Sequence, residues 1–454
     1  MKKVVDLILT GSLYQDGELH EETSLIIDGG KVVGVGKFPN LPDSKETIHL
    51  KGVWILPGAV DAHVHTFSNP KEGFFHTTRA AAAGGVTTII DHPLDFPNGI
   101  KNVEDLNKKI LVIEKESFVD VALLGGIVDS NLSEIERFRK AGVCGFKILM
   151  HDTAPQRFSR MHDGPLLEAF EKIRGTGLPA GVHAENDELI KYKVDQWKKA
   201  GSLYPLAHCE TRPPVSEIEA IHKALDFTLH SGVHLHLFHL SLSQDFDLID
   251  WYKEKGVKVT SETCPHYLLL SEESMDRFKG YAKINPPLRA SGEPARLWEL
   301  LAAGKVDLVT SDHAPWFPEQ KEKDSIFDCS SGTPGVQTLL PLMLSEGVAK
   351  GRITLKQMVQ LLSENPARAF GLYPQKGSLL PGSDADLVLI DMKRKWKLRG
   401  DQMESVAKWT LFDGLEIEGK IMITIVRGKI VYRDETVVES RVGKFVSPNS
   451  SAEG

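Results

Sequence analysis

One pattern is repeated eight times between residues 59 and 315: a short apolar run followed by a stretch with helical periodicity. The apolar runs span residues 59–65, 86–93, 119–127, 143–150, 178–185, 234–241, 257–266 and 306–315. Helical stretches such as TTRAAAAGG and PLLEAFEKIRGTG lie between them. Strand–helix alternation of this length predicts a parallel (β/α)8 barrel, an α/β fold. A doubly wound open sheet is the alternative, but the sequence lacks the glycine-rich first turn that is usual for that fold.

The two ends of the chain have a different, β-rich character. Near the N-terminus, the DGGK of TSLIIDGGKVVGVG is a hairpin signal between two apolar runs. Near the C-terminus, DADLVLIDM and KIMITIVRGKIVYRDE also predict short antiparallel strands. We therefore expect residues 1–55 and 375–445 to form one small composite β-sandwich domain. Residues 56–374 would form the barrel, and residues 446–454 a C-terminal tail.

Charge and composition exclude several classes of partner. The 454 residues include 54 Lys and Arg against 62 Asp and Glu, a formal charge of −8, which argues against nucleic acid and anionic membranes. Four scattered cysteines form no paired framework, no leader opens the chain, and no apolar stretch is long enough to span a bilayer. The sequence thus predicts a soluble cytoplasmic protein with neither a nucleic-acid nor a membrane partner.

Two histidines stand one residue apart at the end of the first apolar run, LPGAVDAHVH. Because side chains alternate across a strand, His63 and His65 share one face. Such a pair can be hydrogen-bonded core residues, or it can offer two nitrogens to a metal ion. The pair alone does not decide between these readings.

The other strand ends favour the metal reading. In a (β/α)8 barrel the C-terminal ends of the strands converge on the face that holds the chemistry. The residues expected there are His63, His65, Lys147, His183, His239 and Asp312. Lys147 lies in the apolar run CGFKILM, where an unpaired ammonium is costly. His234 and His236 fall on the opposite face from His239 and are assigned no role.

At these residues the sequence resembles the amidohydrolase superfamily, and within it the cyclic-amide hydrolases: allantoinase, dihydropyrimidinase (hydantoinase) and dihydroorotase. The resemblance covers nearly the whole chain. It rests on LPGAVDAHVH, RAAAAGGVTT, GFK, HAEN, TRPP, ETCPHYL, NPPLR, SDHAP and KGSLLPGSDADLVLID. It implies hydrolysis of a small-molecule cyclic amide at two divalent metal ions.

The resemblance also implies a role for each candidate residue. His63, His65 and Asp312 would bind the more buried metal, and His183 and His239 the second. Lys147 would be carboxylated by CO2, giving N6-carboxylysine that bridges the two ions. A hydroxide between the metals would be the nucleophile, with Asp312 as general base and then acid, and Asn285 would contact the substrate ring. Imidazole and carboxylate ligands suit zinc first, and also iron, cobalt or manganese.

The substrate is less closely defined than the chemistry. Dihydroorotases grip a substrate carboxylate with an arginine and a histidine at the positions held here by Phe67 and Trp316. SDHAPWFPEQK, DHPL and NPPLR are closest to allantoinases, whereas HAENDELI, TRPP and GTPGVQTLLPL resemble hydantoinases. The stretch 65–79 is about three residues shorter than in typical allantoinases. We predict an allantoinase of purine metabolism (allantoin to allantoate), with hydantoinase or dihydropyrimidinase as the alternative and dihydroorotase behind both.

A non-catalytic reading comes from a different class of protein. Some relatives of dihydropyrimidinase keep the barrel, lose the metal ligands and act as assembly scaffolds. All six ligand positions are intact in this sequence, which argues against that reading. Since relatives are often tetramers, we also expect a homo-oligomer, either a tetramer or a dimer.

Overall fold

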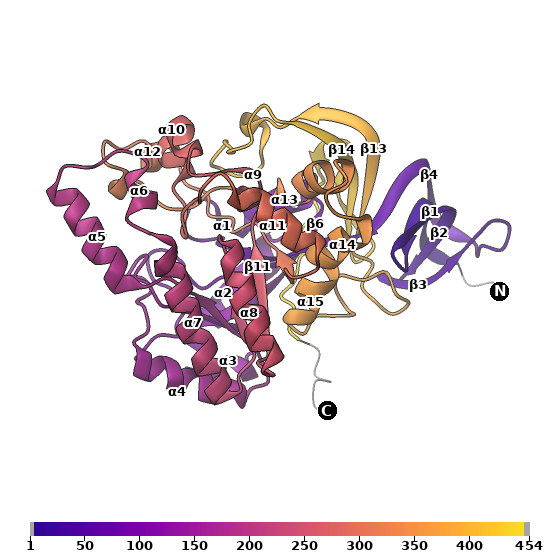
Figure 1. Cartoon of the computed structure of the whole chain (residues 1–454). Coiled ribbons are helices and arrows are strands. Elements are labelled where there is room, and N and C mark those ends of the chain that lie inside the picture. The colour runs from indigo at the N-terminus through magenta and orange to yellow at the C-terminus, as the bar shows by residue number, and fades with distance from the viewer. Residues whose placement is uncertain (1–3, 449–454) are drawn as a thin grey trace.

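The protein is described here by a computed structural model covering residues 4–448, and its strands form two eight-stranded sheets (Figure 1). One sheet is the barrel in the middle of the chain, and the other is built from both ends. The structure therefore confirms the predicted barrel and the predicted pairing of the two termini.

The barrel strands follow each other in chain order and are parallel. They are β5 (Ala59–Val64), β6 (Val86–Asp91), β7 (Asp120–Gly126), β8 (Gly145–Leu149), β9 (Ala180–His183), β10 (Leu235–Leu237), β11 (Val259–Thr263) and β12 (Leu308–Val309). An isolated parallel bridge between Val64 and His313 joins the two edges of this sheet. Each strand lies inside one of the eight predicted apolar runs, so all eight predictions are confirmed.

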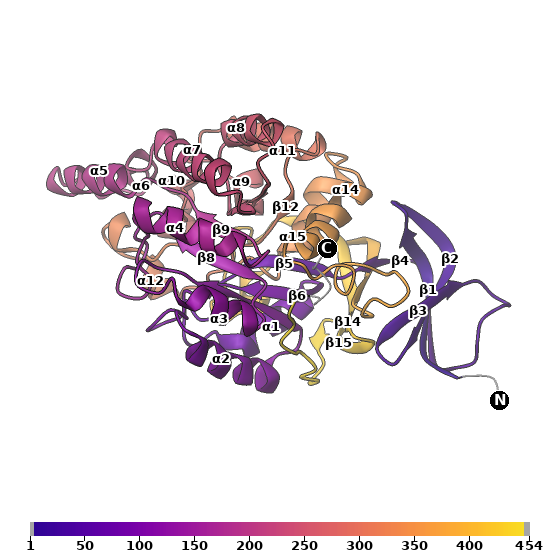
Figure 2. The ribbon, with the colours of Figure 1, turned by 90° about the horizontal axis from the view of Figure 1, so that it is seen from below.

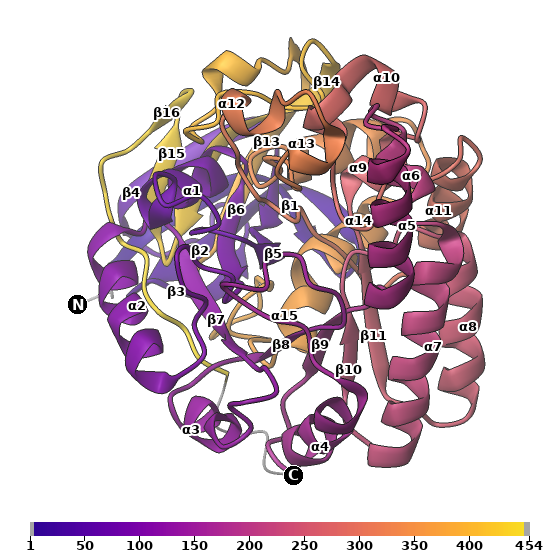
Figure 3. The same ribbon diagram turned by 90° about the vertical axis from the view of Figure 1, so that its left-hand side faces the viewer.

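Helices surround the barrel, as Figure 3 shows for α2, α3, α4, α7 and α8. The longer ones are α1 (Gly73–Ala83), α2 (Val103–Glu116), α3 (Glu134–Lys140), α4 (Asp163–Arg174), α5 (Asp187–Lys199), α7 (Pro214–Ser231), α8 (Ser243–Glu254) and α11 (Glu293–Ala302). Short helices are α6 (Ala207–Glu210), α9 (Pro265–Leu269), α10 (Ser274–Phe278), α12 (Pro318–Lys321), α13 (Leu339–Leu342), α14 (Leu355–Val359) and α15 (Asn365–Ala369). Within residues 4–448, no helix is long and apolar enough to cross a membrane.

Local sequence explains where these elements lie. Every residue of β5 to β9 is buried, because the helices cover the outer face while side chains fill the interior. Helix α5 begins where the Asn186 side chain accepts a hydrogen bond from the Leu189 backbone N–H. Helix α7 ends at Gly232, whose φ of 72° favours glycine. Capping residues of the usual types therefore set where these helices begin and end.

The second sheet is mixed and joins the ends of the chain. Its strands are β1 (Val5–Gln15), β2 (Glu18–Asp28), β3 (Lys31–Gly36), β4 (Ser44–Pro57), β13 (Leu387–Lys397), β14 (Glu416–Val426), β15 (Lys429–Arg433) and β16 (Thr436–Val437). They are ordered β16-β15-β14-β13-β4-β1-β2-β3, so β4 joins the N-terminal strands to the C-terminal ones. Figures 1 and 2 show β1, β2 and β3 projecting beyond the barrel.

The N-terminal and C-terminal strands also share a hydrophobic core. Leu9, Leu25 and Ile55 pack in one buried cluster with Leu387 and Ile425. A backbone bridge between Lys31 and Asp384 adds a second link between the two halves. The domain boundaries at residues 55 and 375 stay a prediction, because neither the sheet nor the core defines where one domain ends and the other begins.

Candidate metal centre

Three predicted ligands form a compact triangle at the end of β5. His63 Nε2 lies 3.2 Å from His65 Nε2, and Asp312 Oδ1 lies 3.3 Å from each of these nitrogens. Ligands about 2.0–2.1 Å from a tetrahedral ion stand roughly 3.3 Å apart. The three atoms therefore have the spacing that one shared metal ion requires.

The buried side of His63 is held by a carboxyl group. His63 Nδ1 and Glu262 Oε1 are 2.5 Å apart and both side chains are fully buried. With Glu262 as the carboxylate, Nδ1 keeps the proton and Nε2 presents its lone pair to His65 and Asp312. Burial raises the pKa of Glu262 to about 8, although Lys147 acts to lower it. A divalent cation beyond the imidazole would favour the carboxylate form.

The second predicted pair has the same arrangement. His183 Nδ1 and His239 Nε2 are 2.9 Å apart, while His183 Nε2 donates to Glu185 Oε2 at 2.8 Å. Burial acts to raise the pKa of Glu185, but Arg212 and His183 hold it well below its usual range. The Nδ1 atom of His183 therefore faces His239 as a lone pair. The rings of His63 and His239 are 5.1 Å apart, so the two ligand sets adjoin.

Lys147 lies on β8 and lines the same cavity as the ligands of both sets. Its ammonium stands 3.9 Å from the centre of the Phe238 ring, and within residues 4–448 no carboxylate forms an ion pair with it. Burial lowers the pKa of Lys147 to about 7, against the nearby charges of Asp312 and Glu262. A substantial fraction is therefore a neutral amine near neutral pH. The lysine is therefore unpaired, as its apolar run suggested, but its surroundings include ionisable groups as well as the Phe238 ring.

Two of the proposed ligands have unusual backbone conformations. His239 has a φ of 43° and Asp312 a φ of 46°, in the left-handed region that non-glycine residues rarely adopt. Strain of this kind costs about 1–3 kcal/mol and concentrates at functional sites. Here it turns both side chains toward the remaining ligands at the strand ends.

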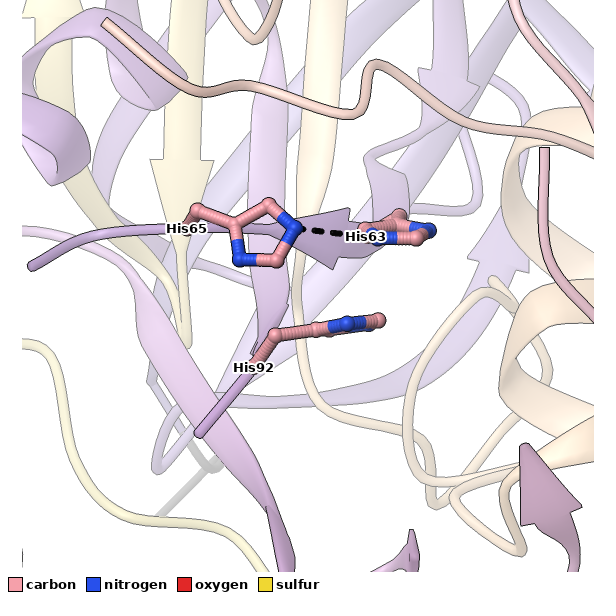
Figure 4. A group of neighbouring side chains, drawn as sticks. All are labelled: His63, His65 and His92. Atoms are coloured by element: carbon pink, nitrogen blue, oxygen red, sulfur yellow. Dashed lines mark hydrogen bonds between the residues drawn. The ribbon is translucent and has the colours of Figure 1, made fainter. Parts of the chain in front are cut away.

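A third histidine, His92, lies beside the first pair (Figure 4). Nitrogens of His63, His65 and His92 all fall within 4.8 Å of one another, so this trio could be taken for a ligand set. The rings of His92 and His63, however, stack nearly parallel, 3.7 Å apart and tilted by 18°. Two stacked imidazoles cannot both direct an in-plane lone pair at one ion. We assign His92, which donates from Nε2 to the Ala62 carbonyl at 3.2 Å, to packing against His63.

A cavity opens over the ligands, and Asn285 is part of its wall. The cavity is lined by His65, Lys147, His183, His239, Asn285 and Asp312, together with Trp316 and Arg157. Within the described residues, Oδ1 of Asn285 is buried and has no hydrogen-bond partner. An amide oxygen in this state is available to a ligand in the cavity, and contact of Asn285 with a substrate ring stays a prediction.

Comparisons with known proteins identify the family of the chain. Residues 54–431 match the model of the amidohydrolase family. The chain belongs to the amidohydrolase family. It is 36% identical to an L-hydantoinase of Paenarthrobacter aurescens over 434 residues, 94% of each chain. It is also 36% identical to an allantoinase of Rubrobacter xylanophilus over 448 residues, 98% of each chain.

The architecture of this amidohydrolase also has a solved counterpart. The structure of an L-hydantoinase (dihydropyrimidinase) from Arthrobacter aurescens has a TM-score of 0.94 and 34% sequence identity. The match covers 98% of this chain and 100% of that one. The similarity therefore includes both the barrel and the sheet built from the two ends.

Sequence reasoning placed the six ligand candidates together but missed the groups that orient them. Glu262 binds Nδ1 of His63, and its other oxygen lies 3.2 Å from His236 Nε2. Asp61 accepts hydrogen bonds from the backbone N–H groups of His63 and Ser311. All lie within motifs that the sequence displays, and the available signal was an ionisable residue inside an otherwise buried strand.

Proposed function

We propose that this amidohydrolase is a binuclear metal-dependent enzyme that opens a C–N amide bond of a cyclic ureide or imide, with allantoin as the first substrate. The supporting observation is that two ligand sets adjoin and line one cavity together with Lys147. His63, His65 and Asp312 would hold one ion, and the second set is His183 with His239. When bound, two such ions supply Lewis acidity that lowers the pKa of water and polarises a carbonyl.

We also propose that Lys147 is the bridge between the two ions. Its neutral amine would add to the carbon of CO2, forming an N–C bond and releasing one proton, to give a carbamate. The lowered pKa of Lys147 favours the neutral amine, and the burial that lowers it disfavours the lone ammonium. Zinc is the first metal to test, followed by iron, cobalt and manganese.

Asp312 and Asn285 would handle the proton and the substrate. Although burial acts to raise it, the pKa of Asp312 is lowered to about 2, chiefly by the hydrogen bond with His65. Its carboxylate is thus available to accept a proton from the attacking water and to return it to the departing ring nitrogen. The unpartnered amide of Asn285 would hold the substrate ring beside it.

A panel of substrates tests this proposal. The protein would be purified without chelator, reconstituted with zinc and assayed with allantoin, hydantoin, dihydrouracil and dihydroorotate. We expect two metal ions per chain, about 3.5 Å apart, and turnover of allantoin. Dihydroorotate should be slower by about 10²-fold or more, because Phe67 and Trp316 provide no charged partners for its carboxylate. No more than a trace of bound metal would contradict the proposal.

Hydantoin hydrolysis is the second candidate function, and the L-hydantoinase likenesses in sequence and structure favour it. A preference for hydantoins over allantoin in the same panel would select it. We further propose that the protein is a homo-oligomer, a tetramer or a dimer, which light scattering of the metal-loaded protein would test.

A further inference from the structure

Arg157 is a cation in the cavity wall, and the carboxylate that acts on it electrostatically, Asp95, is already paired with Lys109. It lies between β8 and α4, and its side chain is half-buried. The only hydrogen bond of its guanidinium within the described residues runs from Nη1 to the Leu94 carbonyl, at 3.3 Å. Its guanidinium stands 5.9 Å from the Phe96 ring, and no carboxylate of residues 4–448 forms an ion pair with it. A guanidinium has five N–H donors, so most of its hydrogen-bonding capacity is unused.

The position of Arg157 connects two cavities. It lines the inner cavity together with Lys147, His183 and Asp312, and it also lines a larger cavity that continues outward. Thr153, Asn285, Trp316 and Ser331 are shared by both cavities as well. A substituent that reached from the metal ligands into the larger cavity would therefore lie beside Arg157.

The other cations of the outer cavity are already engaged or stand at its rim. Lys191 pairs with Asp152 and Asp187, and Arg212 pairs with Glu185. Lys283 donates to the carbonyls of Phe327 and Cys329. Lys198 is exposed, 5.6 Å from the Phe327 ring. Arg157 is thus the cation of this cavity that is both partly desolvated and left with free donors.

We propose that Arg157 binds the substituent carried by the substrate ring and selects substituents that end in a hydrogen-bond-accepting oxygen. The inference rests on the proposed function, whose substrate class it narrows. The shared chemistry is a ureido carbonyl or a carboxylate at the end of a side arm, which a planar guanidinium can hold with two parallel hydrogen bonds. The carboxylate of dihydroorotate is bonded directly to the ring and has no such arm, so it gains nothing from Arg157. A hydrocarbon substituent would instead leave the guanidinium partly desolvated and unpaired, which costs binding.

The test compares selectivity rather than activity alone. Zinc-loaded wild type and Arg157→Met would be assayed with allantoin, hydantoin-5-acetate, 5-benzylhydantoin and unsubstituted hydantoin. We expect Arg157→Met to lower kcat/KM about 10- to 100-fold for the first two, because each loses a charge-assisted hydrogen bond. For 5-benzylhydantoin and unsubstituted hydantoin, which carry no acceptor oxygen outside the ring, kcat/KM should change less than about threefold. A packing defect would lower kcat/KM for all four alike and would overturn the inference.

Two further variants sharpen the result. Arg157→Lys keeps the positive charge but loses the planar fork of donors. It should therefore retain more activity on hydantoin-5-acetate, whose carboxylate is charged, than on allantoin, whose ureido group is neutral. Lys198→Met removes one positive charge at the rim of the outer cavity. It should leave the ratio of kcat/KM for allantoin to kcat/KM for 5-benzylhydantoin within about twofold of the wild-type ratio. An equal shift of that ratio in Lys198→Met would show that general charge, and not Arg157, sets selectivity. A metal-loaded wild type inactive on all four would instead contradict the proposed function.

Discussion

Two buried clusters of ionisable side chains lie at opposite ends of the barrel. They differ in whether a cationic side chain of the protein neutralises the carboxylates. The ligand cluster consists of His63, His65, Lys147, His183, His239 and Asp312, at the C-terminal strand ends. The joint cluster consists of Asp120, Lys376, Asp384, Asp386 and Arg427, where the first residue of β7 meets the sheet built from the two ends.

In the joint cluster the chain neutralises its own carboxylates. Lys376 Nζ lies 2.9 Å from Asp384 and 2.8 Å from Asp386, and it also pairs with Asp120. Arg427 forms a further ion pair with Asp120. Three aspartates that could hold a metal by spacing alone therefore already surround an ammonium. Spacing identifies potential ligands, and the local charge balance distinguishes a metal site from a structural joint.

The ligand cluster lacks such an internal cation. Lone pairs of His63, His65 and Asp312 converge within 3.3 Å, and Lys147 contacts an aromatic ring instead of a carboxylate. Four predictions follow the contrast between the two clusters.

The largest effect is expected for Lys147→Ala in the ligand cluster. Loss of the proposed bridge should remove most bridged metal and lower turnover of allantoin by more than about 10³-fold, because several kcal/mol of transition-state stabilisation depend on the ions. Metal content by mass spectrometry and steady-state kinetics would measure both. Short carboxylic acids in solution should partly restore Lys147→Ala, whereas Lys147→Arg stays cationic and should not respond. Full metal content in Lys147→Ala would exclude the bridge.

In the joint cluster, Lys376→Met should lower the stability of the protein without changing its metal content. Removing the ammonium leaves three buried carboxylates with one cation fewer, which costs about 3–5 kcal/mol of unfolding free energy. Urea denaturation of the metal-loaded protein would measure the shift, with Lys376→Arg as the variant that keeps the charge. Metal content per folded chain should stay at the wild-type value. A loss of metal without a loss of stability would reverse the roles assigned to the two clusters.

The two clusters also differ in how much of them the sequence could reveal. The ligand cluster was predictable because each member lies within or at the end of an apolar run, and a barrel of parallel strands brings these segments together at one face. The joint cluster was not, because Asp120 and Lys376 are 256 residues apart and lie in segments without a shared pattern. Strand alternation also left His236 without a role, but the two oxygens of the Glu262 carboxyl contact His63 and His236. Only tertiary contacts identify such partners.

An intermediate effect is expected from the carboxyl groups behind the ligands. Glu262→Gln should lower the affinity for the ion held by His63 about 10- to 100-fold, because a neutral amide no longer raises the basicity of the imidazole. Glu185→Gln should do the same to the ion held by His183. Competition with a chelator would resolve the two affinities. If both variants weakened the same ion, the division into two ligand sets would be wrong.

The smallest effect is expected at the rim of the joint cluster, for Lys31→Ala. Lys31 pairs with Asp384 at 2.7 Å, but its side chain is 45% exposed, so the loss should be below about 1 kcal/mol at neutral pH. Burial acts to raise the pKa of Asp384, but Lys376 and Lys31 lower it below its usual value. The stabilisation from this carboxylate is therefore present above its unfolded pKa and is lost as the pH falls through its lower folded value. Urea midpoints of wild type and Lys31→Ala should thus converge in acid and in high salt, and a gap that widens in acid would contradict the pairing.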